Sequence, residues 1–110
     1  MAVSSDLIRG HIDTIILSRL MRGDTYGYEI NKEIRQRTNG RFEIKEATLY
    51  SAFRRLEDGK LIESYWGPNE GGARRRYYRI TPWGRMECNK QLDNWRETRS
   101  ILDHLLDTED

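Results

Sequence analysis

Apolar side chains recur every three or four residues in four segments of the chain and alternate with polar ones in two others. The first pattern predicts amphipathic helices, and the second predicts β-strands. The helical segments are residues 6–22, 26–38, 46–58 and 82–106. The alternating segments are residues 61–66 and 75–80, joined by the glycine-rich turn 67–72. Three helices followed by a hairpin predict an α+β, mainly α, winged helix-turn-helix fold, here with an extra long C-terminal helix.

Capping residues and short alternations refine these elements. Asp6 is a candidate N-cap for the first helix, and either Asp24 or Thr25 could cap the second. Between the second and third helices, Phe42 and Ile44 alternate with charged residues. This alternation predicts a short strand or an extended connector.

The last predicted helix is longer than a domain of this size needs for its own core. Thr81 and Pro82 form a strong start signal, a hydroxyl N-cap followed by proline in the first turn. A helix over residues 82–106 would span about 37 Å. Arg99 interrupts an apolar stripe along one side of it, formed by Cys88, Leu92, Trp95, Leu102, Leu105 and Leu106. Such a stripe needs a partner, and a second copy is the simplest one.

The chain therefore divides into two parts with different expected roles. We expect residues 1–81 to form a winged-helix DNA-binding domain and residues 82–110 to form a dimerisation helix with an acidic tail. The stripe residues of the last helix would make the homodimer interface.

Length, charge and cysteine content narrow the class of protein. The 110 residues suffice for about one domain, and 34% of them are charged. The first twenty residues contain no uncharged apolar stretch, and Cys88 is the only cysteine, which fits a cytoplasmic protein. Residues 41–80 carry nine basic and six acidic side chains, whereas residues 81–110 carry four and seven. A polyanion would therefore meet the middle of the chain and avoid its end.

The third helix and the hairpin form the candidate DNA-binding surface. A helix fits the major groove, and residues 46–58 present small, hydroxyl and cationic side chains away from their apolar face. Three consecutive arginines follow the hairpin tip, and strand alternation places Arg75 on the face opposite Arg74 and Arg76. The expected DNA-binding residues are Lys45, Thr48, Tyr50, Ser51, Arg54, Arg55, Gly72, Arg74 and Arg75. The alternatives are a merely solvated helix face and a winged helix that binds protein instead of DNA.

Other chemistry has little support in the sequence. His11 and His104 lack the spacing of metal ligands, and no nucleophile motif, phosphate-binding loop or carboxylate pair stands out. Cys88 lies on an apolar stripe without a second cysteine, which favours an inert buried thiol. We expect no enzyme activity, no cofactor and no metal.

Four motifs resemble those of the PadR family of transcriptional regulators. They are Tyr26-Gly27-Tyr28-Glu29-Ile30, Glu46-Ala47-Thr48-Leu49-Tyr50, Leu56-Glu57-Asp58-Gly59-Lys60-Leu61-Ile62, and Gly72-Ala73-Arg74-Arg75-Arg76-Tyr77-Tyr78-Arg79-Ile80-Thr81. The resemblance covers almost the whole chain. A single C-terminal helix resembles the small subfamily, and Ser64-Tyr65-Trp66-Gly67 resembles its multidrug-responsive repressors.

The resemblance implies a repressor that binds palindromic operators as a dimer joined through its last helix. It also implies that paired tryptophans at the dimer centre hold a planar aromatic compound that releases the DNA. Trp95 is the matching tryptophan, and the implied ligand-binding residues are Trp95, Leu92, Asp13, Ser18 and Arg99. Arg99 stands where an acidic side chain is expected in members that prefer cationic drugs. The alternative is a regulator without a small-molecule effector, in which Trp95 packs the dimer core.

Overall fold

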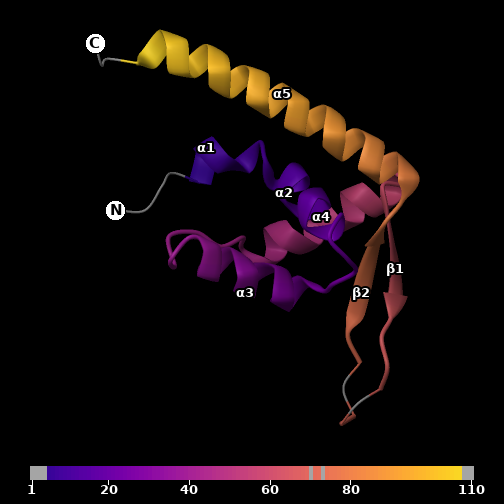
Figure 1. Ribbon diagram of the computed structural model, residues 1–110. Coiled ribbons are helices and arrows are strands. Elements are labelled where there is room, and N and C mark those ends of the chain that lie inside the picture. Colours follow the sequence, from indigo (N-terminus) through magenta and orange to yellow (C-terminus); the bar gives the residue numbers. More distant parts are fainter. Residues whose placement is uncertain (1–4, 70, 73, 108–110) are drawn as a thin grey trace.

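The elements follow the predicted order of three-helix domain, hairpin and long helix (Figure 1). The computed structural model describes residues 5–69, 71–72 and 74–107, with side chains from Leu7 onward. Its elements are α1 (Ser5–Arg9), α2 (Ile12–Leu20), α3 (Gly27–Arg37), α4 (Glu46–Asp58), β1 (Ile62–Trp66), β2 (Arg76–Ile80) and α5 (Pro82–Leu106). The predicted fold class, a winged helix with a long C-terminal helix, is confirmed.

The first predicted helix is divided in two. Gly10 and His11 separate α1 from α2, because glycine disfavours the helix interior and the His11 amide turns back onto the Ile8 carbonyl at 2.7 Å. The His11 ring then lies edge-on to Trp95 of α5, with centroids 5.1 Å apart. The expected cap Asp6 lies outside the described side chains.

Neither expected residue caps α3. Tyr26 occupies the N-cap position without a side-chain hydrogen bond. Thr25 is extended instead, because its amide and carbonyl pair with the backbone of Tyr78 in β2. The Asp24 carboxylate accepts a hydrogen bond from the Tyr65 hydroxyl at 2.6 Å, which raises the pKa of that tyrosine. The loop before α3 is therefore fixed to the hairpin.

The segment between α3 and α4 is a connector, the second of the two predicted alternatives. Asn31 pairs with the backbone of Ile44 in both directions, donating to its carbonyl and accepting from its amide at 2.8 Å each. Asn39 adopts a left-handed conformation with φ of 53°, which turns the chain after α3. These contacts fix the point at which α4 begins.

The core lies between α2, α4, the hairpin and the first half of α5. Ile16 and Leu17 of α2 are fully buried at its centre, and Phe53 of α4 stacks on Tyr78 of β2 with centroids 3.9 Å apart. The antiparallel hairpin pairs Ile62 with Ile80 at one end and Trp66 with Arg76 at the other. Its apolar end is buried in this core, while its other end extends beyond it as the wing (Figure 1).

Helix α5 begins as the sequence predicts and then leaves the core. The Thr81 side chain accepts a hydrogen bond from the Gly84 amide at 3.0 Å, with Pro82 in the first turn. Every residue from Asp93 to Asp107 is exposed. The radius of gyration is 15.8 Å, against about 13 Å for a compact chain of this length. Within the described part of the chain, no helix has the length and apolarity to cross a membrane.

Candidate nucleic-acid interface

Helix α4 presents a polar face on the side opposite its core contacts. Leu49, Phe53 and Leu56 are buried against the domain. The opposite face exposes Ala47, Thr48, Ser51 and Arg54. Among the described residues, Arg54 has no ion-pair partner, so its guanidinium is available to an external anion.

The wing carries its three arginines on two faces, as strand alternation predicted. Arg74 and Arg76 both lie over the Trp66 ring, with guanidinium carbons 5.7 and 5.8 Å from its centroid. Arg75 lies over the Tyr26 ring at 4.6 Å. Tyr26 also packs edge-on against Tyr77 of β2. Aromatic rings thus hold all three cations near the start of α3.

A groove of about 610 Å³ separates the wing from α4 and the first residues of α3. Arg54, Arg74, Arg75 and Arg76 line it, and among the described residues the carboxylate in its lining is that of Glu57. That carboxylate accepts a hydrogen bond from Ser64 and lies 3.6 Å from Arg76. Because Glu57 is neutralised within the chain, the described lining of the groove carries a net positive charge, which suits a polyanion.

Comparison with known proteins identifies the family. The model of the PadR-like family of transcriptional regulators matches residues 16–90, more than half of the chain. The chain belongs to the PadR-like family of transcriptional regulators. Within the chain, the match includes α4, the hairpin and the first turns of α5.

Relatives match this chain over most of its length. A solved transcriptional regulator from Clostridium thermocellum is 50% identical, with a TM-score of 0.85 over 94% of this chain and 97% of that one. A PadR family regulator from Clostridium difficile is 37% identical, with a TM-score of 0.77 over 87% and 98%. An uncharacterized protein of Lysinibacillus sphaericus is 50% identical over 92% of this chain and 93% of its own.

Four of the nine predicted DNA-binding residues of this PadR-like regulator line the groove. Tyr50 and Arg54 line it from α4, and Thr48 and Ser51 are exposed on the same helix. Lys45 is the exposed N-cap residue of α4. On the wing, Arg74 and Arg75 line the groove, and Gly72 has a φ of 81° that only glycine adopts readily.

Arg55 has a partner that the sequence did not predict. Its guanidinium binds both carboxylate oxygens of Asp13 on α2, at 2.5 and 3.3 Å. The hydrogen bond to Asp13 raises the pKa of Arg55. An expected DNA contact and an expected ligand contact are thus paired with each other. This ion pair holds the side of α4 that carries Arg55 against α2.

The expected ligand-binding residues lie on two helices, α2 and α5. Trp95 is 41% exposed and contacts His11, while Leu92 is half-buried against the core. Ser18 is half-buried further along α2. Arg99 lies 3.8 Å from Asp103 one turn later on α5. Both of the expected ligand charges, Asp13 and Arg99, therefore already have partners within the chain.

Cys88 differs from its expected role at the dimer interface. Its side chain is fully buried in the core of its own chain, where burial raises the pKa of the thiol. The apolar stripe of α5 therefore changes partner along its length. The turns near Cys88 complete the chain's own core, and Leu102, Leu105 and Leu106 remain exposed.

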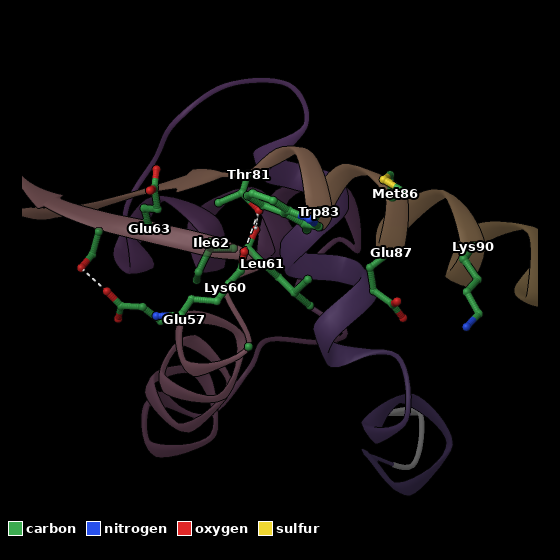
Figure 2. Close-up of a pocket in the computed structure, with 12 residues that line it drawn as sticks. Glu57, Lys60, Leu61, Ile62, Glu63, Thr81, Trp83, Met86, Glu87 and Lys90 are labelled. Atoms are coloured by element: carbon green, nitrogen blue, oxygen red, sulfur yellow. Dashed lines mark hydrogen bonds between the residues drawn. The ribbon is translucent and has the colours of Figure 1, made fainter.

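A larger cavity of about 1080 Å³ lies between the end of α4, the start of β1 and the first turns of α5 (Figure 2). Leu61, Trp83 and Met86 give it apolar walls, and Glu87 and Lys90 project from α5 along one side (Figure 2). None of the side chains expected to bind DNA or a ligand lines this cavity.

The sequence interpretation missed Trp66, Tyr26 and Glu57 as parts of the groove between α4 and the wing. Strand alternation could have placed Trp66 on the same face as Arg74 and Arg76. The partnership of Glu57 with Ser64 could not have been read from the sequence, because it depends on how the wing is oriented relative to α4.

Proposed function

We propose that this PadR-like regulator represses transcription by binding palindromic operators as a homodimer. The observation that carries the proposal is the groove between α4 and the wing, where four arginines meet and the carboxylate of Glu57 is neutralised. In this arrangement α4 enters the major groove and the wing contacts the neighbouring phosphates.

Titration of a labelled duplex of about 30 base pairs, long enough for two half-sites, tests this function. The affinity should fall steeply between about 50 and 200 mM salt. Replacing Arg54 with alanine should weaken binding about tenfold, because a partnerless guanidinium on the exposed face of α4 is lost. Arg85→Ala is the matched control, since Arg85 is exposed on α5 outside the groove.

A protein that binds no duplex would instead favour the winged helix that binds protein, and duplex binding that Arg54→Ala leaves unchanged would show that the site is wrongly assigned. If the control variant weakens binding as much as Arg54→Ala, charge anywhere on the surface accounts for the affinity, and the groove is the wrong site.

The proposed dimer joins through the exposed second half of α5. Ile101, Leu102, Leu105 and Leu106 expose apolar surface on a helix that has already left the domain core. A second copy crossing the same stripe would bury these side chains under two-fold symmetry. It would also hold two α4 helices at a fixed separation.

The proposed effector is a planar aromatic compound held at Trp95, which relieves repression. Contacts at the start of α2 connect the Trp95 site on α5 to α4, the proposed DNA-binding helix. His11 contacts Trp95, Thr14 donates a hydrogen bond to Gln91 of α5, and Asp13 binds Arg55 of α4. A ligand that moves α5 would therefore tilt α4 through α2 and lower operator affinity. Because Asp13 and Arg99 are already paired, the aromatic faces would dominate ligand recognition.

Quenching of tryptophan emission tests the effector site with two probes, a cationic acridinium and a neutral anthraquinone. Both should quench the wild type and the Trp83→Leu variant, whereas Trp95→Leu should lose most of the quenching. Loss of quenching in Trp83→Leu instead would place the compound in the cavity beside Trp83. No quenching dependent on Trp95 would leave a regulator whose Trp95 only packs between helices.

A further inference from the structure

The stability of the fold does not explain why a tryptophan stands at position 66. It ends β1 and is 56% exposed, so most of the free energy available from burying an indole is not gained. It lies on the wing beyond the buried end of the hairpin, where it faces the groove shared with α4. A large aromatic side chain in such a position points to a role in binding.

The two guanidinium groups over Trp66 differ in how they are held. Arg76 donates a hydrogen bond to the Ser64 hydroxyl at 2.8 Å, and Ser64 donates one to Glu57 near the end of α4. Arg76 is therefore tied to α4 through side chains. Arg74 has a long contact, 3.5 Å, from its Nε to the Gly67 carbonyl. Its other described contact is the Trp66 ring.

We propose that Trp66 is a positioning residue that holds Arg74 ready to bind a DNA phosphate. Contacts with α4 hold Arg76, and Arg76 restricts the movement of the indole ring. The ring in turn restricts the movement of Arg74. A free arginine loses considerable side-chain entropy when it binds, and stacking on a fixed ring removes part of that cost beforehand. Arg76 meanwhile neutralises Glu57. This inference rests on the proposed DNA-binding function.

A pair of substitutions separates the aromatic face from apolar bulk. Trp66→Leu keeps apolar volume without a π face, and Trp66→Phe keeps a π face. Trp66→Leu should bind a duplex of about 30 base pairs about three- to tenfold more weakly, and Trp66→Phe should retain most of the affinity. Trp83→Leu is the matched control, because Trp83 is 65% exposed but lies outside the groove.

A double-mutant cycle decides whether Trp66 acts through Arg74. Trp66→Leu should have no further effect in an Arg74→Ala background, because the side chain that it positions is gone. The slope of log affinity against log salt should stay unchanged in Trp66→Leu and become shallower by about 1.8 in Arg74→Ala, because each protomer of the dimer loses one phosphate contact. Thermal unfolding should be unaltered by either substitution.

The proposal fails if the two substitutions weaken binding independently, since Trp66 would then contact DNA itself. It also fails if Trp66→Leu and Trp83→Leu behave alike. These outcomes leave the DNA-binding function intact, whereas a wild-type protein that binds no duplex overturns both proposals.

Discussion

A chain carrying Leu102→Glu and Leu105→Glu is expected to be monomeric and to bind duplex at least about a hundredfold more weakly than the wild type. These side chains are 43% and 73% exposed on the part of α5 that leaves the core. Two buried carboxylates facing their symmetry mates would lack partners, which a small interface cannot tolerate. A monomer has only one α4 helix to place on the DNA. It loses the gain in effective concentration that the second protomer would provide.

Sedimentation velocity at micromolar concentration measures the assembly, and circular dichroism measures the fold. The helical signal should persist, because every residue from Asp93 to Asp107 is exposed and none of them builds the core. Met86→Glu is the matched control, since Met86 is 70% exposed on the first half of the same helix. A double variant that remains dimeric would refute the assigned interface, as would a control that dissociates.

Strong local patterns predicted the elements on which these proposals depend. The predicted range of α4 agrees with the structure at both ends, because a clear apolar face lies between a charged start and Gly59. The start of α5 was also correct, because Thr81 and Pro82 act within one turn. In both cases, side chains a few residues apart determine the backbone without reference to the rest of the fold.

Contacts between distant segments could not be predicted in the same way. Asp13 and Arg55 are far apart in the chain, and each looked available for an external partner until α2 and α4 were packed together. The apolar stripe on α5 led to a wrong prediction at Cys88 for a related reason. Periodicity identifies an apolar face, but it cannot distinguish the turn near Cys88 that covers its own core from the later turns that remain exposed.

The break between α1 and α2 and the start of α3 were set by tertiary contacts. Gly10 weakens a helix, yet many helices contain one glycine, so its effect depended on where His11 packs. Thr25 resembles a helix cap in sequence, but pairing with Tyr78 keeps it in an extended conformation. The backbone pairing, with a residue more than fifty positions away in the chain, thus overrides the local preference of Thr25 for a helix cap.

Replacing Gly84 with alanine is expected to destabilise the protein by about 3 kcal/mol, although alanine is the better helix former. A Cβ at this position would lie 2.1 Å from the Leu61 carbonyl oxygen and 2.7 Å from Cγ1 of Ile80. The Leu61 oxygen cannot simply move away, because it accepts hydrogen bonds from the amide and hydroxyl of Thr81 at 3.0 and 3.1 Å. The added methyl group must therefore displace the start of α5.

Urea and thermal denaturation measure this effect, which should lower the midpoint of thermal unfolding by more than about 10 °C. Gly10→Ala is the matched control, because no atom lies within 4 Å of a Cβ added there, and it should be neutral or stabilising by up to about 1 kcal/mol. The displaced helix also carries the proposed dimer stripe. At temperatures where Gly84→Ala is still folded, its duplex affinity should fall, because a tilted α5 changes the separation of the two α4 helices. A variant as stable as the wild type would show that α5 can move away from Leu61 without a loss in the free energy of unfolding. The close packing between Gly84 and Leu61 would then have no role in setting the separation of the two α4 helices.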